Sequence, residues 1–225
     1  MRKLVIIILL SSFSSFSSKA QTLKIGLELG PSVNLANEEV VRFDHMSISN
    51  TKQLRIAARV GIPVQIKITK GFKINSGIYY AMKGGMHTSA NSSIPSISYS
   101  SLEVPLIFTF SRFDETRNSF FIGAGPYLGV GISGNLRVFG MKRKVNWGYE
   151  NPTADMQRLE YGAQLQMGVE FRNKWFCRFV AQHTLNNLAA DEKTIFGGST
   201  ADHKFYKISS MAYASFTVGY YLFSH

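Results

Sequence analysis

The chain has 225 residues, of which 45% are hydrophobic and 17% are charged, and its formal net charge is +11. This hydrophobic content excludes a disordered chain, and the length suits one barrel or sandwich domain with a full core. The single cysteine, Cys177, excludes an intramolecular disulfide and any cysteine-based metal cluster. Because no nucleic-acid-binding motif is present, we expect the basic charge to meet anionic lipid rather than nucleic acid.

The first twenty residues have the features of an export signal. Arg2 and Lys3 precede an apolar run from Leu4 to Leu10, and small residues flank Lys19 at the end of the segment. The run is far shorter than the roughly 20 residues that a transmembrane helix requires, and no later segment supplies an uninterrupted one. We therefore predict a signal peptide over residues 1–20 and a mature barrel domain over residues 21–225, so that any membrane span consists of β-strands.

Segments of alternating apolar and polar residues follow one another along the mature chain, which is the periodicity of β-strands. The longest runs from Leu54 to Ile68, and others lie at residues 23–30, 74–83, 102–110, 120–132 and 159–171. Two weaker segments, at residues 175–181 and 212–222, bring the number to about eight. Eight is the smallest strand number of outer-membrane-type barrels.

The connections between these segments alternate in length. Short turns are expected at residues 69–71, 114–118 and 172–174, and long polar loops near residues 32–52, 85–99, 134–156 and 186–204. Short periplasmic turns and longer extracellular loops are typical of up-and-down barrels in the bacterial outer membrane. Aromatic residues gather beside the short turns and the carboxyl terminus, and we expect several of them to form a periplasmic girdle. They are Phe72, Phe108, Phe110, Phe120, Phe121, Phe171, Trp175, Phe176, Tyr220, Tyr221 and Phe223.

The small volume of such a barrel decides which face of the strands points inward. A secreted sandwich or a lipocalin-like barrel would show the same alternation with its apolar face inside. However, the interior of an eight-stranded barrel is only just wide enough for side chains to fill. Dozens of large apolar residues would overfill it, whereas the many glycines on the polar face leave room for long polar side chains. We therefore predict an all-β, eight-stranded antiparallel up-and-down transmembrane β-barrel with a polar lumen.

Charged residues on the inward face are predicted to form a network in the lumen, because an isolated buried charge is costly. The predicted network comprises Arg55, Arg59, Glu28, Glu103, Glu160, Glu170 and Arg178, with Lys24, Lys73 and Lys83 as further partners. The network either plugs the lumen, the interpretation we favour, or lines a gated path. Pro105 lacks the N–H that a closed ladder requires, so we predict a bulge or a locally broken ladder there.

Three strand motifs carry a resemblance to a known family. They are Ser101-Leu102-Glu103-Val104-Pro105-Leu106, Phe121-Ile122-Gly123-Ala124-Gly125-Pro126-Tyr127, and the strand from Tyr161-Gly162 to Gly168-Val169-Glu170. With these motifs the chain resembles the PorT-like outer-membrane β-barrel family of Gram-negative bacteria, over about residues 22–223. The resemblance implies location in the cell outer membrane. Since the founding member is associated with secretion and with maturation of exported proteases, it also implies an accessory role in protein secretion or envelope assembly.

No catalytic or metal-binding signature is recognisable in the sequence. The five histidines are scattered, without an HExxH motif or paired cysteines. We therefore predict that the protein is not an enzyme and has no cofactor. One alternative is a surface enzyme acting on lipid or peptide, for which His183 with Ser199 and Asp202 is the best combination that the sequence offers. The other alternative is a small passive porin-like channel.

The most basic feature of the chain is the predicted loop at residues 134–156. It contains Arg137, Lys142, Arg143 and Lys144. These side chains either bind the phosphates of surface lipopolysaccharide or an acidic protein, or are solvated, and the nearby Trp147 favours contact. The expected partners are thus outer-membrane lipid and lipopolysaccharide, together with the secretion or envelope proteins that the family resemblance implies.

Overall fold

The computed structural model describes residues 22–42, 47–84, 96–112, 118–138, 141–148, 154–186, 188 and 204–224. Predictions for residues 1–20, Ser199 and Asp202 lie outside this part of the chain. The strands are β1 (Leu23–Arg42), β2 (Ser47–Thr69), β3 (Phe72–Gly84), β4 (Ser96–Pro105), β5 (Ile107–Ser111), β6 (Ser119–Val138), β7 (Met141–Lys144), β8 (Leu159–Glu170), β9 (Trp175–Thr184) and β10 (Lys204–Ser224). Within the described ranges, no helix is long and apolar enough to cross a membrane.

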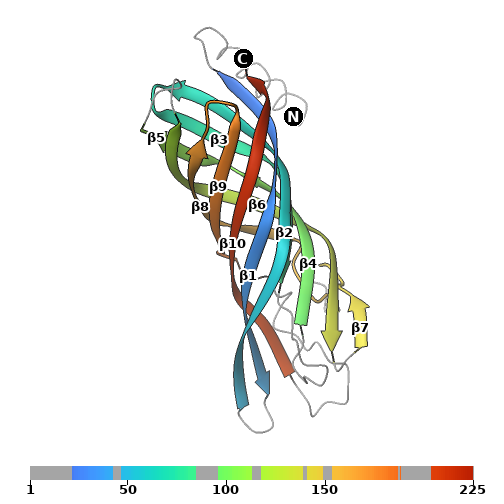
Figure 1. Ribbon diagram of the computed structural model, residues 1–225. Helices are drawn as coiled ribbons and strands as arrows, with labels where there is room; N and C mark the ends of the chain where they lie inside the picture. The colour runs from blue at the N-terminus through green and yellow to red at the C-terminus, as the bar shows by residue number, and fades with distance from the viewer. Residues whose placement is uncertain are drawn as a thin grey trace, which may run out of the picture.

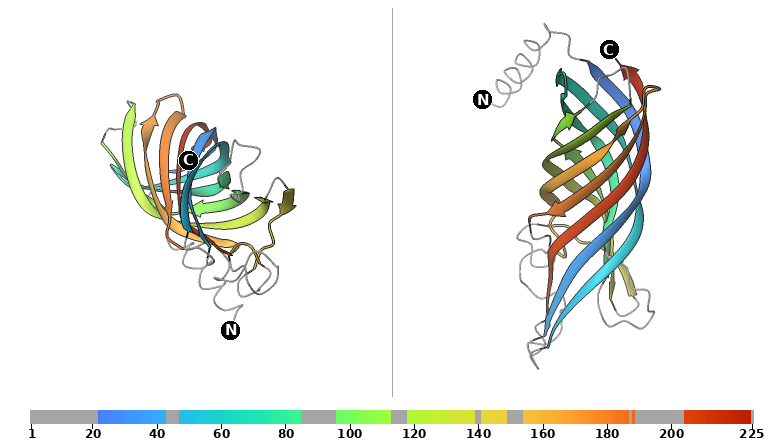
Figure 2. Two further views of the ribbon diagram at one scale, coloured as in Figure 1. Left: turned by 90° about the horizontal axis from the view of Figure 1, so that it is seen from below. Right: turned by 60° about the vertical axis from the view of Figure 1, so that its left-hand side comes forward.

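The strands form one antiparallel sheet that closes on itself. β1 pairs with both β2 and β10, and the ring continues from β2 through β3, β4 with β5, β6, β8 and β9 back to β10. β4 and β5 together fill one position of the ring, and β7 pairs only with β6, so the ten segments make eight barrel strands. The predicted eight-stranded antiparallel barrel is confirmed, and its strands are steeply tilted (Figures 1 and 2).

The two ends of the barrel differ. β1 begins and β10 ends at one end, which also carries the short connections and is called the inner end below; the opposite end is called the outer end (Figure 1). At the outer end β1 and β2 stay paired as far as Arg42 and Ser47, so the loop predicted at residues 32–52 is wrong. Part of the loop predicted at residues 134–156 is also a hairpin, because β6 and β7 pair up to Val138 and Met141. Sustained apolar alternation is missing from residues 36–42 and 47–53, so no strand signal covers them.

The strand that contains Pro105 is interrupted without a change of register. β4 ends at Pro105 and β5 begins at Ile107, and the pairs on either side of the break keep the same register with β3 and with β6. The Oγ of Ser76 donates to the carbonyl oxygen of Pro105 over 2.8 Å, and the N–H of Leu106 donates to that of Pro126 over 2.9 Å. The locally broken ladder predicted at Pro105 is confirmed, and it involves no bulge at this residue.

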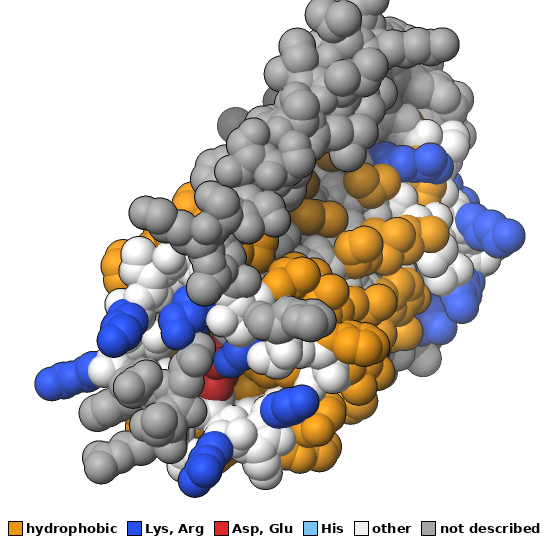
Figure 3. Space-filling model, turned by 90° about the horizontal axis from the view of Figure 1, so that it is seen from above, with side chains coloured by type: hydrophobic (Ala, Val, Ile, Leu, Met, Phe, Trp, Pro, Cys, Tyr) orange, Lys and Arg blue, Asp and Glu red, His pale blue; other side chains and the backbone are white. Residues whose placement is uncertain are grey.

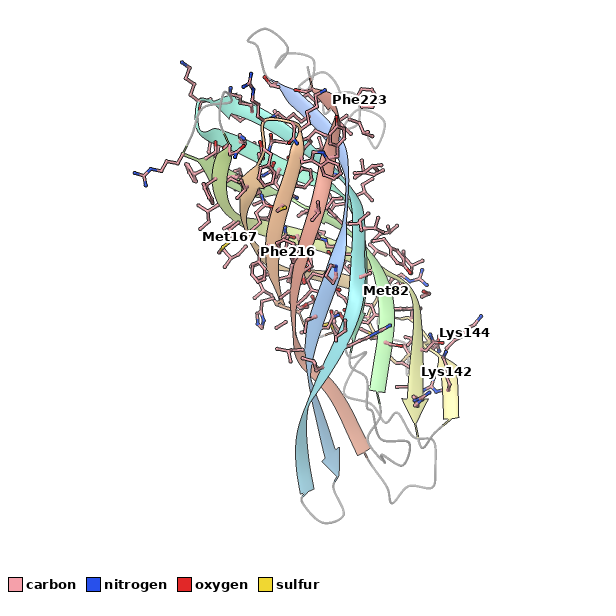
Figure 4. All side chains as sticks on the ribbon, in the orientation of Figure 1. Met82, Lys142, Lys144, Met167, Phe216 and Phe223 are labelled. Carbon is pink, nitrogen blue, oxygen red and sulfur yellow. The ribbon has the colours of Figure 1, made fainter. Side chains whose placement is uncertain are left out.

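Large apolar side chains cover the outside of the barrel. Exposed examples occur on every strand of the ring, such as Ile56 at 75% and Leu29 at 67% exposure. Met167 and Phe216, both about half exposed, are two of those labelled in Figure 4. Because water-soluble proteins rarely expose contiguous apolar surface of this extent, the exterior matches a lipid environment and the polar face is the lumen.

Inward glycines accommodate aromatic rings from the neighbouring strand. The directly paired residues are Gly26 and Tyr221, Gly61 and Tyr79, Gly162 and Tyr127, Gly168 and Phe121, and Gly219 and Phe176. A Cβ atom at any of the last four glycines would lie less than 3.0 Å from its partner's ring. The glycines therefore make room for rings lying on the barrel wall, in addition to the long polar side chains that the sequence predicted.

This packing divides the aromatic residues predicted for the periplasmic girdle. Phe121, Phe176 and Tyr221 are buried in the lumen. Phe110 and Trp175, in contrast, are exposed on the apolar exterior at 62% and 47%. The outward members, which also include Phe108, Phe120, Phe171 and Phe223, form the aromatic band at the inner end.

Candidate functional site

An ion pair crosses the middle of the lumen between β1 and β9. The Oε2 of Glu28 lies 3.0 Å from the Nη1 of Arg178, and both side chains are almost fully buried. Arg178 also donates to the hydroxyl of Tyr79 over 3.1 Å, and Thr217 donates to the Oε1 of Glu28 over 2.9 Å. The pair is thus hydrogen-bonded to β3 and β10, which links four strands through the lumen.

A second group, called the Lys83 cluster, consists of Lys83, Glu103 and Glu160. The buried ammonium of Lys83 contacts both carboxylates and lies 2.6 Å from the Oε1 of Glu160. Glu103 also accepts from the Nε2 of Gln182 over 3.0 Å, and Glu160 accepts from the hydroxyl of Tyr127 over 2.6 Å. These additional bonds offset the cost of removing three charges from water. The cluster joins β3 to β4 and β8 inside the barrel.

Arg59 is also fully buried but less well bonded. Its Nη2 lies 3.8 Å from the Oε2 of Glu103, and its guanidinium carbon lies 4.1 Å from the centroid of the Tyr79 ring. None of its three nitrogens forms a hydrogen bond with a described protein group. Arg59 is therefore held mainly by longer-range electrostatic attraction and by its contact with the aromatic ring.

The inner end of the lumen opens into a basic pocket of about 460 Å³, called the inner-end cup. The carboxylate of Glu170 lines it and lies 2.9 Å from the Nζ of Lys73 and 3.4 Å from that of Lys24. Gln65 donates to the same carboxylate over 2.5 Å. In Figure 3, which looks down on this end, Lys and Arg side chains surround acidic atoms. The basic residues that line the cup are Lys24, Lys67, Lys70, Lys73, Arg112, Arg172 and Lys174.

The outer end of the lumen is filled by apolar side chains, called the outer-end plug. Its members are Ile97, Tyr99, Leu136, Val145, Met156, Leu188 and Met211, with Trp147 packed against them. Backbone hydrogen bonds hold the connecting segment in place: Val145 donates to Gly134 over 3.0 Å, and Gln157 donates to Leu188 over 2.8 Å. The segment after β7 thus folds back onto the barrel and contributes to closing it.

The structure brings six of the seven charged residues predicted for the lumen into ion pairs. These are Arg59 with Glu103, Glu28 with Arg178, and Glu160 and Glu170 with lysines. Arg55 lies apart, because it is only half-buried and its Nη1 donates to the backbone carbonyl of Lys83 over 2.7 Å. It forms no ion pair with any carboxylate among the described residues.

The basic residues predicted to bind an anionic partner lie at the outer end. Arg137, Lys142, Arg143 and Lys144 are all exposed, and Figure 4 shows Lys142 and Lys144 on β7, at the opposite end from Phe223. Arg143, however, is bound within the chain, since its Nη1 and Nη2 lie 2.6 and 2.5 Å from the two carboxylate oxygens of Asp155. This pair stabilises the segment that leads into the outer-end plug.

Sequence reasoning did not identify the plug or the cup. Most plug residues lie outside the alternating segments, where no periodicity marks them as buried. The cup did have a signal in the sequence, because several of its cations lie in or beside the three predicted short turns: Lys67, Lys70, Arg112, Arg172 and Lys174. Because short turns meet at one end of a barrel, these cations had to gather there.

The residues considered for catalysis do not form a site within the described part of the chain. His183 is exposed on the outward face of β9, and Ser199 and Asp202 are not described. Among the described residues, there is no group of three or more metal-ligating side chains.

An antiparallel eight-stranded ring with an apolar exterior and a charged lumen defines the class of outer-membrane β-barrels. Comparison with family models gives the particular family. Residues 14–190 match the model of the outer membrane protein beta-barrel domain, and the chain belongs to this family. The protein is therefore located in the cell outer membrane, where the inner end with its short turns faces the periplasm.

Solved structures of outer-membrane proteins are among those similar to this chain. OprG from Pseudomonas aeruginosa has a TM-score of 0.51 at 8% identity, and the match covers 91% of this chain and 97% of OprG. Ail, the attachment invasion locus protein of Yersinia pestis, has a TM-score of 0.36 at 12% identity, over 87% of this chain and 98% of Ail. At 8% identity the similarity to OprG concerns the fold alone. Comparison with curated proteins found no match.

Proposed function

We propose that the protein is a non-catalytic, non-conducting outer-membrane barrel with an accessory role in protein secretion or envelope assembly. The observation that carries this proposal is the Lys83 cluster. Its three side chains are at most 2% exposed and join strands across the lumen. A permeating ion would have to break at least one of these pairs, and breaking a buried pair costs about 3–5 kcal/mol.

The outer-end plug supports the same proposal independently. Seven buried apolar side chains fill the lumen there. A hydrated ion that entered from this side would lose its water shell against apolar surface, which is strongly unfavourable. The passive porin-like channel is therefore the less favoured alternative.

The accessory role rests on the resemblance to the PorT-like family, whose founding member is associated with secretion. A barrel with a closed lumen can contribute to secretion through its surfaces and loops, without passing cargo through its own interior. This assignment fits a protein in which buried ion pairs, such as that of Lys83 with Glu160, join the strands across the lumen.

Conductance across planar bilayers tests the closed lumen. We expect the purified barrel to give no channel steps in the folded state, with folding verified by heat-modifiable migration on a gel. Steps of constant size in the folded preparation would overturn the proposal in favour of a passive pore.

The accessory role is tested by comparing secreted and surface proteins between the parent bacterium and a strain that lacks this gene. We expect selective retention of exported proteins while the envelope stays intact, and recovery when the gene is restored. An unchanged set of secreted and surface proteins would separate this chain from the role of the family that it resembles.

A further inference from the structure

The inner-end cup concentrates positive charge in a concave space. Among the residues that the structure describes, seven Lys and Arg residues and one carboxylate, Glu170, line a volume of about 460 Å³. Ligand pockets in proteins typically measure about 300–1,000 Å³. Clefts lined by charge of one sign focus the electric field and raise the local concentration of oppositely charged ligands.

The charges of the cup fall into two groups. Lys24 and Lys73 are bound to Glu170, at 3.4 and 2.9 Å. In contrast, Lys70, Arg112, Arg172 and Lys174 are exposed, and none of them forms an ion pair with a carboxylate among the residues that the structure describes. The second group supplies at least four cations at the mouth of the cup that are available to an external anion.

The shape of the barrel limits what can enter. The Lys83 cluster and the outer-end plug close the lumen further along its axis, so a ligand of the cup enters from the periplasmic side and leaves the same way. The walls are strand ends and short turns, which are too closely spaced to admit a folded protein. A small molecule or a headgroup of several negative charges fits both the volume and the charge.

We propose that the inner-end cup is a binding site for a multivalent phosphorylated ligand presented from the periplasm. Five of its seven cations are lysines. An ammonium is a compact point charge that suits phosphate oxygens in any direction, while Arg112 and Arg172 add planar forks for bidentate contact. The ligand is either a soluble phosphorylated compound or the phosphorylated headgroup of a lipid. The inference rests on the closed lumen proposed above, since an open lumen would make the cup a pore entrance.

Calorimetric titration of the folded, detergent-solubilised protein with tripolyphosphate tests the site. We expect one bound ion per barrel and an affinity that falls with salt, because the contacts are electrostatic. The variant K70Q/R172Q removes two exposed cations of the cup and should weaken binding at least tenfold. The matched control K142Q/K144Q removes the same charge from β7 at the outer end and should leave binding unchanged.

One further ligand identifies the source of the phosphate. A soluble short-chain phosphatidic acid that binds more tightly than tripolyphosphate would identify a lipid headgroup, and the reverse order would identify a soluble compound. Absence of tripolyphosphate binding, binding of an oligoglutamate peptide in its place, or equal weakening by both double variants would each overturn the site. Conductance of the same preparation is measured separately. Channel steps would contradict the closed lumen, whereas absence of tripolyphosphate binding without channel steps would contradict only the binding site.

Discussion

The two ends of this lumen are built on different physical principles. At the outer end, apolar residues from β4, β6, β10 and the segment after β7 pack together as a plug. At the inner end, basic residues surround an open cup in which Glu170 is the one carboxylate among the described lining residues. An eight-stranded barrel needs to be blocked at only one level to be closed. Because the plug and the Lys83 cluster block the lumen elsewhere, the cations at the inner end need not be paired to close it. They are therefore available to bind a ligand.

The largest effect is expected at the Lys83 cluster, which separates the two ends. The variant Lys83→Met leaves two buried carboxylates without their shared cation, so the free energy of unfolding should fall by about 3–5 kcal/mol. Urea titration of the folded barrel in detergent, followed by heat-modifiable migration, measures the change.

The matched control for Lys83→Met is Arg59→Met. Arg59 forms no hydrogen bond to a described group, and its replacement leaves Glu103 still bound to Lys83, so removal of its desolvation cost should offset the lost attraction and keep the change in stability below about 1 kcal/mol. Equal losses in the two variants would show that hydrogen bonding does not determine how much a buried cation contributes to the free energy of unfolding.

An intermediate effect on stability is expected at Gly219, which lies against the aromatic ring of Phe176. A Cβ atom at Gly219 would lie 2.1 Å from the Phe176 ring and 2.6 Å from the carbonyl oxygen of Leu27. Gly219→Ala should therefore destabilise the barrel by about 1–3 kcal/mol through overpacking. Urea titration against the parent protein measures this loss.

Gly129 provides the control for this prediction, since a Cβ atom there would meet nothing closer than 3.6 Å. Gly129→Ala should be neutral or slightly stabilising, because alanine loses less chain entropy on folding. If both alanine variants behave alike, contact with the ring is not the reason for glycine at Gly219.

The smallest effect is expected at Glu170, whose carboxylate is the one that lines the cup among the residues the structure describes. Glu170→Gln removes one negative charge near the bound phosphates, and one charge at 4 Å in water is worth about 1 kcal/mol. Tripolyphosphate should therefore bind about two- to fivefold more tightly, as measured by the same calorimetric titration. Unchanged or weaker binding would mean that Lys24 and Lys73 need Glu170 to hold them in place.

Much of the fold was readable from local pattern. Period-two alternation located all the ring strands, and the volume of a small barrel predicted the inward polar face that Glu28 and Gln166 now show. Location in the outer membrane followed from the same pattern and is supported by the family match. The outward extensions of β1, β2 and β6 were missed, because they lie beyond the segments of sustained period-two alternation, and Leu136 of β6 is buried in the plug rather than exposed to lipid.

The candidate sites, like the fold, were predicted from the sequence only in part. That Glu103 and Glu170 would be paired followed from the cost of a buried charge, but Lys83 as the shared partner of two carboxylates did not. Met156 and Leu188 lie in stretches without alternation, so their burial in the plug had no local signal.

The sequence by itself determined the strand period, the direction of each face and the kinds of residue that had to share the lumen. Only the tertiary structure decided which of them meet. Glu28 and Thr217, for example, are 189 positions apart and hydrogen-bonded over 2.9 Å. The reason is physical: alternation is a property of neighbouring residues, whereas pairing depends on ring closure and strand register, which bring distant residues to the same level of the barrel.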